Sequence, residues 1–180
     1  ELKKKNVNVM ALSLNEGVLT AKLRAAGIET FVIPESQNHF VKILWKALKI
    51  FKQRKLDIIH SHRYKENLLA VVLARFLSAR CLVATIHGLP EPPLQEPSEK
   101  NAVDVKTRIK FCLLNRFFTR IVAVSEELKR VLIGRYHFNR GRFEVIHNGI
   151  LLPIETPLPS PSEAGKFHIG TVGRMVAVKD

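Results

Sequence analysis

The chain has 180 residues, enough for one domain with a full hydrophobic core and little more. Its hydrophobic content of 46% excludes a disordered chain, and no apolar run approaches the roughly 20 residues of a membrane-spanning helix. Lys and Arg number 29 against 16 Asp and Glu, which gives a net charge of +13. This excess predicts an anionic partner, such as nucleic acid, a phospholipid surface or a phosphorylated substrate.

Short apolar runs alternate with helical patterns along the first 150 residues. The apolar runs predict strands at residues 7–12, 28–33, 57–61, 81–86, 121–124 and 143–147. The helical patterns fall at residues 19–26, 40–55, 66–77, 104–119 and 126–135, the last capped by Ser125. Such alternation is typical of an α/β protein with a parallel sheet. We therefore predict a Rossmann-like parallel sheet flanked by helices.

A proline-rich stretch follows this region. Residues 151–166 contain four prolines and several serines without periodicity, which is typical of a linker between domains. On this division, residues 1–150 form an N-terminal domain, and residues 167–180 begin a second domain with a new strand. Because the chain starts at what resembles a helix end and then enters a sheet, we expect a preceding strand to be missing.

Residues able to bind a ligand stand where the predicted strands end. His60 and His62 close one strand, and their spacing of two places both on one face. His87 and Gly88 follow the next strand, and glycine lets a ligand approach the backbone closely. Ser125 ends another strand, and the last one ends in His147, Asn148 and Gly149, a turn able to take positive φ. Ligands bind at the carboxyl edge of open parallel sheets, so we predict one site along this edge.

The helix at residues 40–55 is strongly amphipathic. Lys42, Lys46, Lys49 and Gln53 recur on one face, opposite an apolar face. The basic stripe and Trp45 could dock on an anionic membrane. The alternative is a crossover helix that packs its apolar face on the sheet and leaves the lysines in water.

Other apolar residues are expected inside the molecule. In the second basic helix, at residues 104–119, the inward residues should be Ile109, Leu113, Phe117 and Phe118. Cys81 and Cys112 are isolated in apolar surroundings. They are therefore expected to be buried thiols of a reducing compartment, which favours a cytoplasmic location.

Six motifs in this order resemble the retaining glycosyltransferases of family four, which have the GT-B fold of two Rossmann-like domains facing across a cleft. The motifs are NEG at 15–17 with LRAAG at 23–27, DIIHSH at 57–62, TIHG at 85–88, VAVS at 122–125, VIHNGI at 145–150, and VGR at 172–174 with Lys179. Together they cover nearly the whole chain. The resemblance implies the N-terminal half of a GT-B fold, lacking its first strand, followed by the start of the C-terminal domain.

This resemblance also places the missing strand. In the family, the first strand lies between those expected here at residues 7–12 and 57–61. The sheet should therefore show a vacancy at that position or a forced pairing across it.

The resemblance further implies transfer of a sugar from a nucleotide-sugar donor to a saccharide or lipid-linked acceptor, with retention of configuration and without a metal or other cofactor. Arg174 and Lys179, beside Gly173, would grip the donor diphosphate. Fixed cations there stabilise the charge that builds on the leaving group. The family's glycine-rich loop and paired-glutamate motif are absent from the sequence, so the chain alone is expected to be inactive.

The strand-end residues receive roles by the same resemblance. His87 is the candidate catalytic residue; it would hydrogen-bond the donor sugar or the leaving phosphate rather than act as a general base. His60 and His62 would lie on the acceptor side, with His62 the better ligand candidate and His60 paired with a neighbouring loop. Gly88, Asn148 and Gly149 would shape the cleft.

Two other functions remain open at this point. The strand-end histidines could assemble a zinc or di-metal site of a hydrolase, although no strand ends in an aspartate. The charge could instead indicate a nucleic-acid-binding module, although exposed stacking aromatics and a binding motif are lacking; we therefore expect no nucleic-acid partner. For the transferase, we expect work in polysaccharide or cell-envelope synthesis, with the basic helices at the inner face of the membrane as a hypothesis.

Overall fold

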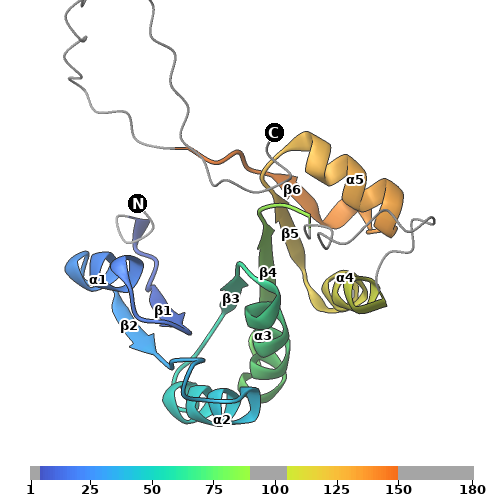
Figure 1. Ribbon diagram of the computed structural model, residues 1–180. Coiled ribbons are helices and arrows are strands. Elements are labelled where there is room, and N and C mark those ends of the chain that lie inside the picture. The colour runs from blue at the N-terminus through green and yellow to red at the C-terminus, as the bar shows by residue number, and fades with distance from the viewer. Residues whose placement is uncertain (1–4, 90–104, 150–180) are drawn as a thin grey trace, which may run out of the picture.

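The computed structural model describes residues 5–89 and 105–149 (Figure 1). The predicted linker at 151–166 and the start of a second domain at 167–180 lie outside the described residues. Strands and helices alternate as predicted, in the order β1 (Met10–Ser13), α1 (Val18–Ala25), β2 (Glu29–Val32), α2 (Phe40–Phe51), β3 (Ile58–Ser61), α3 (Tyr64–Leu77), β4 (Cys81–Ile86), α4 (Val105–Phe117), β5 (Arg120–Ala123), α5 (Glu126–Tyr136) and β6 (Phe143–Val145).

All strand pairs are parallel, and they form two sheets. Strands β3, β4, β5 and β6 lie side by side in that order, and β1 pairs with β2 alone. Parallel strands need crossover connections, and the helices between consecutive strands supply them. The predicted α/β fold class with parallel sheets flanked by helices is confirmed.

The two sheets are not joined to each other. Within the described residues, neither β1 nor β3 has a partner on the edge that faces the other sheet, and Figure 1 shows the two strands apart. The expected vacancy is therefore present, and no pairing is forced across it. The loops after β1 and β2 still meet each other and the start of α3, because Glu35 accepts hydrogen bonds from Asn15 Nδ2 at 3.1 Å and Lys65 Nζ at 2.7 Å.

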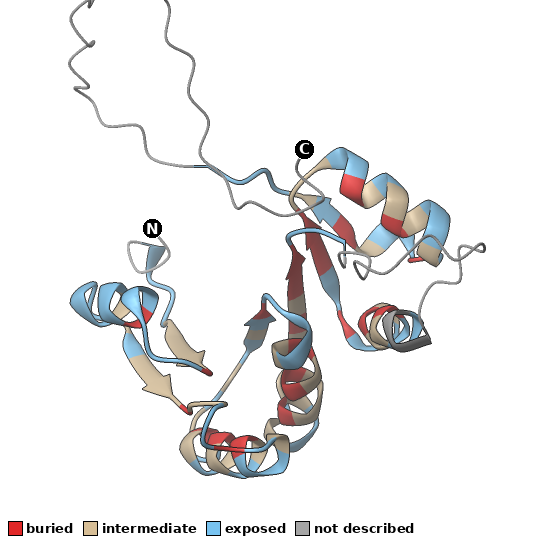
Figure 2. Ribbon diagram, viewed as in Figure 1, coloured by how far each residue is buried: buried red, intermediate tan, exposed pale blue. Residues whose placement is uncertain are grey.

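The main core lies on one face of the four-stranded sheet. In the register, Leu82, Ala84 and Ile86 of β4 share a face with Ile121 and Ala123 of β5. Helices α3, α4 and α5 pack on this face with apolar side chains, and Figure 2 shows the buried residues concentrated there. Burying a large apolar side chain contributes about 1.5–3 kcal/mol, so this face carries most of the packing free energy.

A second core lies between α2 and α3. Ile43, Ala47 and Phe51 of α2 are buried against Leu69 and Leu73 of α3. The apolar face of α2 is therefore buried inside the molecule, as expected if α2 is a crossover helix between two strands. Its opposite face stays in solvent.

Some predicted contacts are wrong. In α4, Ile109 and Phe117 are 52% and 49% exposed, whereas Phe111 and Leu114 are buried; Phe118, just after the helix, is buried as predicted. Cys112 lies on the exposed side of α4 and Cys81 is only partly buried; both are free thiols. The prediction of two buried cysteines is therefore wrong, most clearly for Cys112.

Several predicted boundaries shift by a few residues. Helix α2 ends at Phe51 instead of residue 55, and Arg54, beyond the helix, donates a hydrogen bond to Glu29 of β2 with an N–O distance of 2.7 Å. Strand β6 ends at Val145 instead of residue 147. Neither Asn148 nor Gly149 adopts positive φ, which among the described glycines occurs only at Gly27. No described helix has the length and apolar character to cross a membrane.

Candidate active site

Three histidines form a row at the carboxyl edge of β3 and β4. The ring centroids of His60 and His62 lie 4.5 Å apart, and those of His62 and His87 lie 5.6 Å apart, with the rings stacked in both pairs. His62 Nδ1 and His87 Nε2 are 3.3 Å apart, within hydrogen-bonding distance. The predicted convergence of these strand ends is therefore present.

The sheet register produces this row. Ser61 of β3 lies opposite Ala84 of β4, and both side chains enter the face that packs on the helices. Because side chains alternate along a strand, the residues on either side of Ser61 project from the other face. His60 and His62 therefore share a face with Val83, Thr85 and His87 of β4; His60 lies opposite Val83 in the register and contacts Thr85, the next residue along on that face.

His60 is fixed by β4. Its Nε2 lies 2.8 Å from Oγ1 of Thr85, which is buried. The partner is thus a side chain of the neighbouring strand rather than the loop predicted from the sequence. Thr85 was not a predicted site residue, although its position two residues before His87 places it on the same face. With one nitrogen bonded and one face against His62, His60 holds the row in place.

The other side of β3 fixes the start of α3. The Ser61 hydroxyl donates a hydrogen bond to Asn67 Oδ1 at 2.7 Å, and both residues are buried. This contact ties the strand to the second turn of α3, which sets the position of the loop that carries His62. The sequence patterns did not single out Asn67, because a polar residue in a helix is normally exposed.

The row lowers the pKa of two of its members. Partial burial is the main cause for His60, followed by the charges that His62 and His87 carry when protonated. Partial burial also lowers the pKa of His62, and the proximity of His87 adds to this effect, while the nearby Glu66 carboxylate acts in the opposite direction. The neutral form of both rings is therefore favoured.

The His62–His87 pair has a definite hydrogen-bonding capacity. When both rings are neutral, one nitrogen of the facing pair carries the proton and the other accepts it. The two remaining nitrogens, His62 Nε2 and His87 Nδ1, are then one donor and one acceptor. A sugar hydroxyl both donates and accepts, so it matches this pair. With one more proton on the pair, both outer nitrogens donate, which suits a phosphate oxygen.

Basic side chains continue beyond the row. Arg63, Tyr64 and Lys65, at the start of α3, line a hollow of about 250 Å³ together with Glu35 and Glu66. Lys65 pairs with Glu35, and the exposed Arg63 lies close enough to help lower the pKa of the Glu35 carboxyl. Next to His62, two basic side chains therefore lie together with two acidic ones.

The remaining predicted site residues lie in different places. Gly88 is exposed, and no atom lies within 4 Å of the point that a β-carbon would occupy there, so its backbone is open to a ligand. Asn148 and Gly149 are exposed and follow β6, which is separated from β4 by β5. Their part in shaping the cleft stays a prediction. Gly173, Arg174 and Lys179 lie outside the described residues, and their roles stay predictions.

The metal-hydrolase alternative finds no support in this geometry. Across residues 5–89 and 105–149, no group of three or more His, Cys, Asp or Glu side chains could hold a metal ion. In the row, the His60 nitrogen turns to Thr85 and the facing nitrogens of His62 and His87 turn to each other. The three rings are stacked rather than converging on one point.

Comparison with known proteins is consistent with this arrangement. Residues 1–152 match the model of Glycosyltransferase Family 4. A relative from Escherichia coli, UDP-Gal:alpha-D-GlcNAc-diphosphoundecaprenol alpha-1,3-galactosyltransferase, is 26% identical over 110 residues, which are 61% of this chain and 27% of the relative. The D-inositol 3-phosphate glycosyltransferase of Mycobacterium ulcerans is 28% identical over 157 residues, which are 78% of this chain and 31% of the relative.

A solved structure shares the fold. The crystal structure of a glycosyltransferase from Rickettsia africae superposes with a TM-score of 0.61 at 21% identity, over 83% of this chain and 37% of that chain. The chain thus spans about a third of the length of the proteins that it matches. None of these matches points to a hydrolase or to a nucleic-acid-binding protein.

Proposed function

Because this chain belongs to Glycosyltransferase Family 4, we propose that the whole protein transfers a sugar from a nucleotide-sugar donor to a hydroxyl group of a saccharide or lipid-linked acceptor. We propose further that the transfer retains the anomeric configuration and needs no metal ion or other cofactor. The proposed location is the cytoplasm, within polysaccharide or cell-envelope synthesis.

The His62–His87 pair is the observation that carries this proposal. Two strand ends present a hydrogen-bonded imidazole pair whose outer nitrogens match a sugar hydroxyl or, after protonation, a phosphate oxygen. Both rings are exposed, so a ligand can reach them. His87 would bond the donor sugar or the leaving phosphate, and His62 would bond the acceptor.

The names of the relatives support the proposed substrate classes. The Escherichia coli relative is named for UDP-Gal and for a sugar carried on diphosphoundecaprenol, and the mycobacterial one for inositol 3-phosphate. Both named acceptors contain phosphate. A phosphorylated acceptor would also suit the positive charge of Arg63 and the net charge of +13.

Arg174 and Lys179 would complete the reaction from the second domain. Breaking the bond between sugar and phosphate builds negative charge on the leaving diphosphate. A bidentate arginine and a lysine stabilise that charge more in the transition state than in the ground state. This pair and the adjacent Gly173 are carried over from the family resemblance.

The test is product analysis with the protein at its natural length. A panel of nucleotide sugars is offered with lipid-diphosphate and sugar-phosphate acceptors, in the presence of EDTA, and the product linkage is determined. We expect transfer from one donor with retention. Loss of one hydrogen-bonding group that stabilises a transition state typically lowers kcat about 10²–10³-fold, so His87→Ala should lower turnover by that order.

The control is His39→Ala, which removes an exposed imidazole before α2, outside the row. This variant should keep its turnover. Equal turnover of His87→Ala and the unchanged protein would contradict the role of the pair. Hydrolysis of the donor without transfer to any acceptor, or activity that EDTA abolishes, would contradict the proposed reaction.

A further inference from the structure

Helix α2 presents an exposed face on which apolar and basic side chains lie together. Its buried side faces α3 through Ile43, Ala47 and Phe51. On the opposite side, Val41 is 66% exposed and Trp45 is 62% exposed. Single exposed apolar side chains are common on protein surfaces, so these two residues carry meaning only through the charges that surround them.

The charge of this face has one sign. Residues 36–56 contain six Lys and Arg but no Asp or Glu. Lys42, Lys49 and Lys52 are exposed, and no carboxylate within the described residues pairs with them. Among the residues that the structure describes, Arg54 is the one member of the six with an acidic partner, Glu29. Uncompensated lysines on one surface repel one another unless an anionic partner approaches.

The apolar and basic side chains are arranged in adjoining stripes. At 100° per residue, Val41 and Trp45 lie along one border of the exposed face, and Lys42, Lys46 and Lys49 lie beside them. The Lys49 ammonium sits 5.4 Å from the centre of the Trp45 ring. A helix that lies in the surface of a bilayer has this pattern, with aromatic and apolar side chains entering the acyl boundary and lysines at the head groups.

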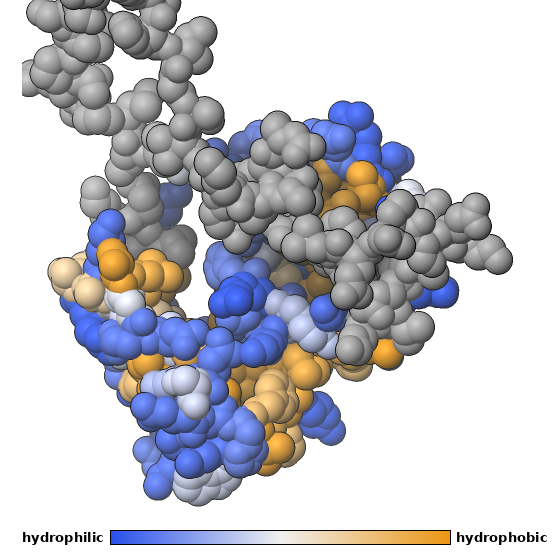
Figure 3. Space-filling model, in the orientation of Figure 1, coloured by the Kyte–Doolittle hydropathy of each residue, from blue (hydrophilic) through white to orange (hydrophobic). Residues whose placement is uncertain are grey.

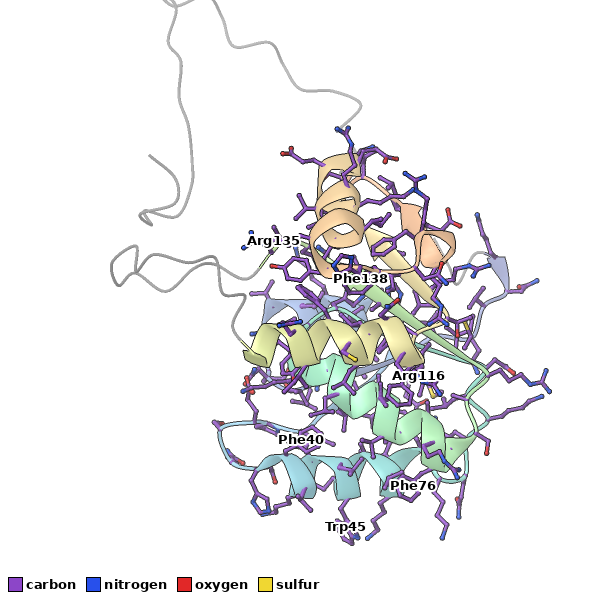
Figure 4. All side chains as sticks on the ribbon, turned by 90° about the vertical axis from the view of Figure 1, so that its right-hand side faces the viewer. Phe40, Trp45, Phe76, Arg116, Arg135 and Phe138 are labelled. Atoms are coloured by element: carbon purple, nitrogen blue, oxygen red, sulfur yellow. The ribbon has the colours of Figure 1, made fainter. Side chains whose placement is uncertain are left out.

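The end of α3 extends the same surface. Phe76 is 67% exposed and is flanked by the exposed Arg75 and, just after the helix, Arg80. Figure 4 shows Trp45 pointing away from the body at the lower rim, with Phe76 on the neighbouring helix at the same rim. In Figure 3 the lower end of the molecule, where α2 lies, is largely hydrophilic. The exposed aromatics thus stand as separate anchors within a polar, basic surface.

We propose that the outer face of α2, together with the end of α3, is a docking surface for an anionic phospholipid membrane. Trp45, Val41 and Phe76 enter the interface, and Lys42, Lys46 and Lys49 contact the head groups. This surface consists of residues other than the histidine row, so it docks whether or not the proposed transfer takes place.

Trp45 provides the test, because it is the single tryptophan of the chain. The chain is mixed with vesicles of phosphatidylcholine alone or with about one third phosphatidylglycerol. We expect a blue shift of the tryptophan emission and co-sedimentation with the anionic vesicles only. Lipids brominated in the acyl chain should quench the emission, and about 0.5 M salt should release the chain, because salt screens the head-group attraction.

Charge removal tests the assigned residues. A lysine near an anionic surface contributes about 1 kcal/mol, or about a fivefold change in partitioning. Lys42→Gln combined with Lys49→Gln should therefore weaken vesicle binding about 25-fold by the same constant. The matched control is Arg130→Gln with Arg140→Gln, which removes two exposed charges in and after α5 and should leave binding within about twofold.

Three results would overturn the proposal. The first is equal weakening in the lysine pair and the arginine control. The second is vesicle binding without any change in Trp45 emission, which would assign the contact to another surface. The third is tight, salt-sensitive binding of duplex DNA by the chain, weakened by the lysine substitutions, without binding to anionic vesicles.

Discussion

The position of each histidine depends on a few specific side-chain contacts. His60 would be free to turn away from the row without Thr85, and β3 would be free to slide against α3 without the Ser61–Asn67 bond. A shift of one residue in strand pairing would send every side chain to the other face. The register of β3 on β4 therefore decides which side chains form the row, and the Ser61–Asn67 and His60–Thr85 contacts both agree with it.

The row should make folding sensitive to acid. The pKa of His60 and His62 in the folded chain lies below the ordinary histidine value. Below about pH 6.5 the unfolded chain then binds protons that the folded chain does not, so the free energy of unfolding falls as the pH falls. Above that pH both states are neutral at these rings, and the full stability is present.

Thermal unfolding at about pH 7.5 and about pH 5.5 checks this effect. His60→Gln keeps a hydrogen-bonding group near Thr85 but does not titrate, so its melting temperature should fall less on acidification. Because the rings keep solvent contact, we expect a difference of about 1 kcal/mol or less, or about 2–4 °C for a chain of this size. An identical fall in His60→Gln, with His39→Gln as the reference variant, would contradict the assignment.

The sequence predicted that the three histidines lie close together, but not the residues that hold them in place. The period of two at His60 and His62, and the repeated placement of polar residues after strands, follow from strand geometry alone. Thr85 and Asn67 received no role because their contacts depend on which strand and helix lie next to β3. Asn148 and Gly149 were assigned to the cleft because they also follow a strand, and the order β3-β4-β5-β6 places β5 between their strand and β4.

At the scale of the elements, the helices differ in how well their sequences define them. Ser125 precedes α5 and accepts a hydrogen bond from the Leu128 amide at 3.1 Å, as its predicted role as N-cap requires. Glu126 and Glu127 follow in the first turn, where they favour the positive end of the helix dipole. The N-cap residue and the acidic first turn predict the same starting point, and the helix begins there.

This cap is open to a direct test. Ser125→Ala removes the acceptor of the Leu128 amide and should lower the free energy of unfolding by about 1 kcal/mol. Ser36→Ala, at an exposed serine in the loop before α2, should change it by less than about 0.5 kcal/mol. Denaturant unfolding of the two variants measures both values. Equal values would show that the cap contributes nothing to stability.

In helix α4, the spacing of apolar residues does not identify which face is buried. Ile109, Leu113 and Phe117 are spaced by four, and Phe111 and Leu114 form a second apolar stripe with Phe118, which was predicted to be buried. Either stripe could face a core by spacing alone. The contacts with Phe138 and Phe143 select the second stripe, since the Phe111 ring packs edge-on to Phe138 and Phe138 does the same to Phe143. Those partners are distant in sequence, so no local pattern could indicate the choice.

The whole molecule is divided into a well-packed part and a lightly packed part. Most residues of β4 and β5 are buried, whereas every residue of β1 and three of the four in β2 are only partly buried. In α1 only Thr20 is buried. Segments with few buried contacts open at lower free energy than the core, so the two parts should differ in local stability.

Amide hydrogen exchange measures this difference. We expect the amides of β1, α1 and β2 to exchange at least about tenfold faster than those of β4 and β5. The measurement on the native chain by mass spectrometry or NMR resolves the segments. Uniform protection across β1 and β4 would show that the chain opens only as a single unit.

The interrupted sheet has a consequence for handling the chain in solution. One continuous sheet would have two outer strands, whereas two separate sheets have four. Each such strand offers amide and carbonyl groups that another polypeptide can pair with. Copies of this chain at high concentration would then tend to associate through these strands. At low ionic strength the net positive charge keeps the copies apart, and added salt would screen that repulsion.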